Sequence, residues 1–141
     1  MMNGTFDETA LAADLRRDEA VRLLPYRCTA GKLTIGIGRN LDDVGISAEE
    51  AAVLLGNDIR RVLAGLDRQL PWWRGLSAGR QRALANMAFN LGLPRLLGFR
   101  QMLAALQAGQ WEEAARQALD SKWAGQVGER ADRIARLIRE G

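Results

Sequence analysis

The sequence contains no histidine and a single cysteine, Cys28. The absence of imidazole excludes serine–histidine triads, papain-like cysteine–histidine pairs and nearly all histidine metal sites. One cysteine cannot form an intramolecular disulfide, and no CxxC or Cys/His cluster is present to bind zinc. Acid–base chemistry is therefore left to carboxylates, hydroxyls and one thiol, and we expect neither a metal nor an organic cofactor.

Long apolar runs are also missing. None approaches the roughly 20 residues that span a bilayer, and the first twenty residues carry acids where a signal peptide carries bases. We expect no signal peptide, no transmembrane segment, no stable membrane insertion and synthesis in the cytoplasm. The net charge of +3 and the pI of about 9.7 suit a polyanionic partner, namely nucleic acid, anionic lipid or bacterial wall polymer, without choosing among them.

The apolar residues near the N-terminus predict an amphipathic helix over residues 7–24. Leu11, Leu15 and Leu23 lie four or eight positions apart and form one stripe, and Pro25 is expected to end the helix. Glu19 falls within this stripe. A carboxyl group among apolar side chains tends to keep its proton near neutral pH, which is the property of a general acid. The alternative is that Glu19 lies at the edge of the stripe and pairs with a neighbouring arginine, Arg16 or Arg22.

A strand-like alternation follows this helix. The letters TAG predict a turn between PYRC and KLTIGIG, and the two segments form a short hairpin. In the second strand, Thr34 shares a face with Gly36 and Gly38. Glycine weakens a strand interior, and one reason to accept that cost is the close approach of a ligand or another backbone. We therefore expect free space beside Thr34.

The remaining two thirds of the chain predict helices. Ser47 and Glu50 form a capping box for a long helix, and Ser77 is placed to cap another that stops at Gly92. Further helices are expected around residues 97–106, 111–118 and 131–138, with the tryptophans mostly in the core. The fold class is α+β and mostly α. At 141 residues we expect one domain, 1–141, with an N-terminal lobe of about 10–50 that contains the β-hairpin, a linking helix of about 48–68 and a helical lobe of about 69–141.

The segment LRRDEAVRLLPYRCTAGKLTIGIGRN resembles the catalytic helix and hairpin of bacteriophage lysozymes, the endolysins or muramidases that cut bacterial peptidoglycan. Their signature is a glutamate, eight residues, an aspartate, five residues and a threonine. The resemblance continues through RQRALANMAFNLG, GFRQMLAALQAGQWEEAA and SKWAGQVGERADRI, so that it spans roughly residues 10–140. It implies a lysozyme-like fold and hydrolysis of the β-1,4 bond between N-acetylmuramic acid and N-acetylglucosamine, which lyses the bacterial host.

The resemblance also implies roles for individual residues. Glu19 is the general acid, Cys28 occupies the position of the second carboxylate, and Thr34 positions the attacking water. Further residues are implied to bind or orient the substrate, with Arg130 pairing with the general acid: Arg130, Asn90, Gln126 and, less clearly, Asn86. The family often has a histidine after the strand, where this chain has Arg39, so a histidine-based ion pair is lost.

Cysteine in place of aspartate is the main departure from the family pattern. A thiolate can act as a base, but at an ordinary pKa of about 8.5 only a minor fraction is ionised at neutral pH. Arg27 and Lys32 are expected to raise that fraction. Two alternatives remain open, namely that Cys28 is a small buried apolar residue, or that Asp42 or Asp43 replaces the missing carboxylate; for these two aspartates a capped, solvated turn is the simpler expectation.

Bacterial peptidoglycan, which is anionic, is the partner implied for the basic chain. We expect a monomer that is held in the host cytoplasm until its release to the cell wall. Three alternatives are kept: a catalytically weakened peptidoglycan-binding phage protein, a lytic transglycosylase-like enzyme that uses the glutamate alone, and a nucleic-acid binder that uses the arginine-rich last helix. Only basic charge favours the last one, so we expect no nucleic-acid partner.

Overall fold

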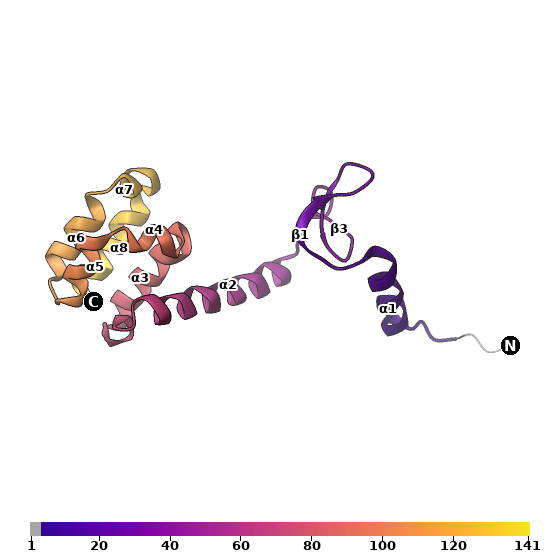
Figure 1. The fold of residues 1–141 in the computed structure, drawn as a ribbon, viewed down its shortest axis with the longest axis horizontal. Coiled ribbons are helices and arrows are strands. Elements are labelled where there is room, and N and C mark those ends of the chain that lie inside the picture. The colour runs from indigo at the N-terminus through magenta and orange to yellow at the C-terminus, as the bar shows by residue number, and fades with distance from the viewer. Residues whose placement is uncertain (1–3) are drawn as a thin grey trace. The chain divides into compact units, whose positions relative to one another are not determined.

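The structure is a computed structural model that describes residues 4–141 (Figure 1). The chain forms two compact units, unit 1 up to Ala52 and unit 2 from Val53 to Gly141. Most residues are helical and three short strands form one antiparallel sheet, so the predicted α+β class, mostly α, is confirmed. Among the described residues, no helix is both long and apolar enough to cross a membrane.

Unit 1 begins with helix α1 (Glu8–Glu19), and its sheet follows. Asp7 caps α1, because its carboxylate accepts a hydrogen bond of 2.9 Å from the backbone N–H of Ala10. The sheet has the order β1 (Arg22–Arg27), β2 (Leu33–Gly36) and β3 (Arg39–Asn40), and both pairings are antiparallel. The two predicted hairpin strands are therefore present, and β3 adds a third strand that the sequence did not indicate.

The predicted first helix is too long by five residues. It ends at Glu19 instead of residue 24, because Ala20 adopts φ 59° and ψ 158° and the next residues pair with β2 as strand β1. Leu23 lies in that strand and is exposed, so it does not extend the apolar stripe. Pro25, which was expected to end the helix, also lies in β1. It falls at the irregular register between Arg22 and Tyr26, where a strand accommodates the missing N–H.

The second strand is shorter than predicted, and its polar face is closed at Thr34. β2 ends at Gly36, after which Ile37 and Gly38 turn the chain into β3. Thr34 is only 3% exposed, and it is the only residue in the range 4–52 that is buried. The expected free space lies beside Gly36, where a Cβ atom would meet no other atom within 4 Å.

The loop after β3 leads into α2 (Ala48–Gln69), which begins in unit 1 and continues in unit 2. The capping box predicted at its start is confirmed. Ser47 N–H donates to the Glu50 carboxylate at 2.9 Å, and Glu50 N–H donates to the Ser47 hydroxyl at 3.1 Å. Glu50 is therefore held by hydrogen bonds at the start of its own helix, independently of any partner in the sheet.

Unit 2 is a helical unit with an apolar core. After α2 come a 3-10 turn, η1, and six helices: η1 (Trp73–Gly75), α3 (Ala78–Leu91), α4 (Leu93–Leu97), α5 (Arg100–Gln107), α6 (Trp111–Leu119), α7 (Lys122–Val127) and α8 (Glu129–Glu140). Helix α8 packs against α3, α6 and α7, and α5 packs against α6 (Figure 1). The largest side chains that are fully buried are Leu66, Leu84, Met87, Leu96, Met102, Leu106, Ile134 and Ile138.

The tryptophans belong to this core, as predicted. Trp73 and Trp123 are buried, and Trp72 and Trp111 pack against the buried cluster from its edge. Ser77 caps α3 as expected, since its hydroxyl accepts from the backbone N–H of Arg80 at 3.3 Å. Burial of apolar side chains thus stabilises unit 2, whereas the described residues of unit 1 bury almost no apolar side chains.

Candidate active site

Glu19 is the last residue of α1, and its side chain contacts the turn between β2 and β3. The residue is exposed rather than embedded in an apolar face. A Cβ atom on Gly38 would lie 3.1 Å from both Cδ and Oε2 of Glu19, so only glycine leaves the carboxyl group its present position. Within residues 4–52 no ion pair joins Glu19 to Arg16 or Arg22, which was the alternative interpretation.

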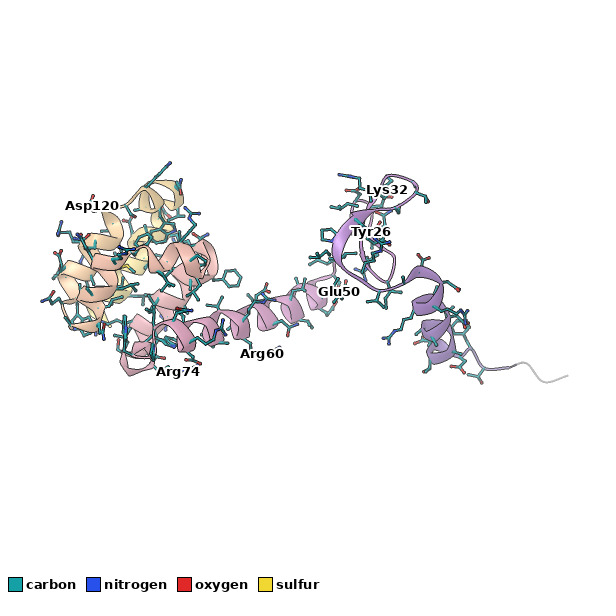
Figure 2. The ribbon with its side chains drawn as sticks, in the orientation of Figure 1. Tyr26, Lys32, Glu50, Arg60, Arg74 and Asp120 are labelled. Atoms are coloured by element: carbon teal, nitrogen blue, oxygen red, sulfur yellow. The ribbon has the colours of Figure 1, made fainter. Side chains whose placement is uncertain are left out.

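Cys28 opens the five-residue turn between β1 and β2. Its N–H donates to the carbonyl of Lys32 at 2.9 Å, and its own carbonyl accepts from the N–H of Gly31 at 2.8 Å. The Thr34 hydroxyl donates to the same Lys32 carbonyl at 2.8 Å. One carbonyl oxygen therefore holds the backbone of Cys28 and the side chain of Thr34 together. The position of Lys32 in the hairpin is visible in Figure 2.

The surroundings of Cys28 favour the thiolate. Hydrogen bonding by the backbone amides of Lys32 and Ala30 lowers the pKa of the thiol, the Thr34 hydroxyl lowers it further, and partial burial opposes them. The groups that stabilise the negative charge are thus dipoles of the turn and of the strand that follows it. The predicted contribution of the cations Arg27 and Lys32 is not among these causes within the described part of the chain.

Both cations are instead paired with the loop that follows β3. Lys32 Nζ lies 3.1 Å from Asp43 Oδ1, and Arg27 lies 3.8 Å from Asp42 Oδ2. Asp42 Oδ2 also accepts from the backbone N–H of Leu33 at 2.8 Å. The two aspartates therefore form the capped turn that was the simpler expectation, and both carboxylates are bound to partners.

Arg39, which stands where the family often has a histidine, makes an ion pair of another kind. Its guanidinium donates two hydrogen bonds to the Glu50 carboxylate, at 2.8 and 2.7 Å, and a third to the Gly45 carbonyl at 3.0 Å. Arg39 and the backbone of Ser47 hold the pKa of Glu50 at about 2. This pair joins β3 to the start of α2, next to the glycine that Glu19 contacts.

The remaining predicted residues lie in unit 2. Arg130 is half-buried and donates to the amide oxygen of Asn86 at 2.9 Å. Both residues line a largely apolar cavity of about 480 Å³ beside α2 and α3. Asn90 accepts from the indole N–H of Trp123 at 2.8 Å, and Gln126 is exposed.

The structure thus brings together some of the predicted site residues. Cys28 and Thr34 share the Lys32 carbonyl, and Arg130 bonds to Asn86. Glu19 and Arg130 belong to different units, and each is placed only within its own. Sequence reasoning missed the roles of Gly38 and of the Lys32 carbonyl. The glycine pattern did signal a close approach at this strand, whereas a backbone carbonyl leaves no signal in side-chain identity.

The chain is similar to known proteins over most of its length. A family model described as phage lysozyme matches residues 16–139. The pre-baseplate central spike protein Gp5 of Enterobacteria phage T4 is 33% identical over 94% of this chain. A probable T4-type lysozyme 2 of Dictyostelium discoideum is 26% identical over 90% of the chain, and an endolysin of Acyrthosiphon pisum secondary endosymbiont phage 1 is 35% identical over 56% of it.

These relatives differ in how much of them the chain covers. It spans 28% of the length of the spike protein, 92% of the Dictyostelium protein and 55% of the endolysin. The matched region is therefore a part of a larger protein in one relative and nearly the whole protein in another.

Proposed function

Because this chain belongs to the phage lysozyme family, we propose that it hydrolyses the β-1,4 bond between N-acetylmuramic acid and N-acetylglucosamine in bacterial peptidoglycan. Glu19 acts as the general acid and protonates the glycosidic oxygen as the bond breaks. The Cys28 thiolate takes a proton from the attacking water, which the Thr34 hydroxyl orients from the opposite face of the sugar. The outcome at the anomeric carbon is inversion.

The observation that carries this proposal is the arrangement around the Lys32 carbonyl. Cys28 occupies the place of the second carboxylate, and a base there must be ionised near neutral pH. The amides of Ala30 and Lys32 lower the pKa of its thiol, and the nearby hydroxyl of Thr34 is buried and fixed at 2.8 Å from the carbonyl. A half-buried cysteine with a purely apolar role needs none of these donors.

The Thr34 hydroxyl has one proton and two possible acceptors. In the neutral site it donates to the Lys32 carbonyl, and hydrogen bonding from the same hydroxyl stabilises the thiolate. Its oxygen keeps lone pairs that accept a hydrogen bond from water. The role proposed for Thr34 is to orient the attacking water through this oxygen.

In unit 2, Arg130, Asn90 and Gln126 are proposed to bind or orient the glycan. Arg130 presents a guanidinium that is bonded through Nε to Asn86, so its terminal nitrogens remain available as donors at the wall of the cavity. Peptidoglycan carries carboxylates on its peptides and lactyl groups, which suits a protein with a net charge of +3.

The test is the clearing of purified peptidoglycan under reducing conditions by wild type, Glu19→Gln, Cys28→Ala, Cys28→Asp and Thr34→Val. We expect wild type and Cys28→Asp to clear the wall and the other three to fail. Cys28→Asp should keep its activity to lower pH than wild type, because a carboxylate ionises several units below a thiol. If wild type and Cys28→Asp share one pH profile, Cys28 is not the base.

Product analysis separates hydrolysis from the other reactions. Hydrolysis gives new reducing ends, whereas a transglycosylase that uses Glu19 alone gives anhydro ends that are lighter by one water. A chain that pellets with peptidoglycan and releases neither product is the weakened wall-binding protein. Activity of Cys28→Asp together with an inert wild type would likewise contradict the proposed base.

The place of action is part of the same proposal. As an endolysin the chain acts on the wall after another protein opens the host membrane, and it does so as a monomer. The similarity to a central spike protein supports a second possibility, in which the same hydrolysis is delivered by a phage tail. The chemistry proposed for Glu19, Cys28 and Thr34 is the same in both cases.

A further inference from the structure

The loop after β3 carries two carboxylates to the turn that holds Cys28, and both of them accept hydrogen bonds at its C-terminal end, from Lys32 and Leu33. Asn40 starts this loop by accepting from the backbone N–H of Asp43 at 3.0 Å and donating to its carboxylate at 2.9 Å. The N–H of Leu41 continues the sheet by donating to the carbonyl of Leu33 at 2.7 Å. The loop is therefore attached to β2 through backbone and side chains together.

The contacts of the two aspartates differ in kind. Asp43 binds the ammonium of Lys32 at 3.1 Å, at the end of the turn. Asp42 accepts from the backbone N–H of Leu33 at 2.8 Å and faces the guanidinium of Arg27, at 3.8 Å, across the turn. Arg27 in turn donates to the carbonyl of Gly31 at 3.1 Å.

We propose that Asp42 and Asp43 are positioning residues for Cys28, which hold the C-terminal end of its turn and screen the two cations that flank it. The expected effect on hydrolysis rests on the proposed function of Cys28, whereas the expected effect on its ionisation does not. Asp42 holds Leu33, and Asp43 holds Lys32, whose carbonyl binds both Cys28 and Thr34. With Arg27 and Lys32 both paired, the thiolate depends on hydrogen bonds from its own turn.

No other ion pair of residues 4–52 involves these four charged side chains. The remaining pairs in that range join Arg17 to Asp14 and Asp18, and Arg39 to Glu50. The side chains of Lys32 and Asp43 are roughly half exposed, so each charge acts on Cys28 through water. One unit charge close to a titrating group in water changes its pKa by roughly a few tenths of a unit.

The single cysteine makes the test specific. The rate of alkylation by iodoacetamide, measured against pH, reports the ionisation of Cys28 alone and does not depend on wall hydrolysis. For Asp43→Asn we expect the alkylation midpoint to fall by about 0.4 pH unit, because Lys32 then has no partner. For Lys32→Gln the midpoint rises by a similar amount, and the double variant returns to the wild-type value.

The matched control is Asp58→Asn, which removes an equally charged side chain from the Asp58–Arg61 pair on α2. It should leave the midpoint unchanged. Unfolding of a variant would move the midpoint upward, toward the ordinary thiol value, so it cannot imitate the expected fall. A midpoint in Asp43→Asn equal to that of Asp58→Asn, or a double variant that does not return to wild type, would overturn the screening role.

The positioning role is tested by comparing two substitutions of Asp42. Asp42→Asn keeps an oxygen that can accept from Leu33, whereas Asp42→Ala removes it. We expect Asp42→Asn to keep kcat at a pH where the thiol is fully ionised, and Asp42→Ala to lose about tenfold in kcat with KM unchanged. Equal kcat values would overturn the positioning role. If wild type does not hydrolyse the wall, the proposed function fails while the alkylation results still decide the screening role.

Discussion

Replacing Gly38 by alanine tests whether the close contact with Glu19 matters for activity. Gly38 has φ 72°, a backbone conformation that costs alanine about 1–2 kcal/mol. The added Cβ would also stand 3.1 Å from Cδ and Oε2 of Glu19, whereas carbon atoms pack at about 3.5–4.0 Å. The carboxyl group must therefore move by a few tenths of an ångström.

Gly36→Ala is the matched control for this change. Gly36 has the same φ of 72°, but a Cβ atom there would meet no atom within 4 Å. Both variants should lose about 1–2 kcal/mol in the free energy of unfolding, because both carry the same backbone strain. Since a displacement of 1 Å at a catalytic group costs about 100-fold, we expect Gly38→Ala to lose about tenfold in the rate of wall hydrolysis.

The assay compares the initial rate of peptidoglycan clearing per folded molecule with the stability from urea denaturation. Gly36→Ala should keep most of the wild-type rate, within about threefold, although it is equally destabilised. Equal losses of rate in the two variants would refute the reasoning, because the loss would then follow from strain in the β2–β3 region and not from the displaced carboxyl group.

Three further changes test the stabilising contacts. Ser77→Ala removes the N-cap acceptor of α3 and should cost about 1 kcal/mol in urea denaturation; a loss below about 0.3 kcal/mol would argue against the cap. Met87→Ala opens a cavity at a fully buried position and should cost about 2–4 kcal/mol, with the activity of each folded molecule retained. The pKa of Glu50 is lowered to about 2 by its bonds to Arg39, so the stability that this pair contributes is present above the ordinary glutamate pKa of about 4.3 and is lost as the pH falls through about 2. The thermal midpoints of wild type and Glu50→Gln should therefore converge on acidification from about pH 5, and a constant difference would contradict the assignment.

The helical part of the fold was predictable because its signals are local. Capping residues such as Ser47 and Ser77 lie next to long apolar periodicities, and the observed helices begin where these caps stand. The end of α1 was not predictable from periodicity. Leu23 continues the four-residue spacing of Leu11 and Leu15, yet it lies in β1, because strand pairing with β2 outweighs the local pattern.

The roles of the candidate site residues stay predictions, and their environment could be predicted from the sequence only in part. The spacing of Glu19, Cys28 and Thr34 identified residues of which two share one carbonyl oxygen. Two expectations about environment were wrong. Glu19 is exposed instead of lying on an apolar face, and the Thr34 hydroxyl is buried where free space was predicted. Both depend on contacts between different elements, such as Glu19 at the end of α1 with Gly38 in the turn after β2, and Thr34 with its strand partner Asn40.

The two units are held together internally by different kinds of force, and this difference decides what a substitution changes. In unit 1 Thr34 is the one buried residue among those described, and the turn of Cys28 is placed by hydrogen bonds and ion pairs. These bonds are directional and lie in a wet environment, so the loss of one moves an atom of the site while it costs little stability. In unit 2 apolar packing dominates, and a truncated side chain such as Met87 leaves a cavity that lowers stability without redirecting a reactive group. Substitutions around Cys28 should therefore alter the pH profile and the rate, and substitutions in the core of unit 2 should alter the unfolding free energy. This distinction would be wrong if a substitution in the core of unit 2 shifted the ionisation of Cys28. It would also be wrong if a substitution in the turn of Cys28 changed only the stability.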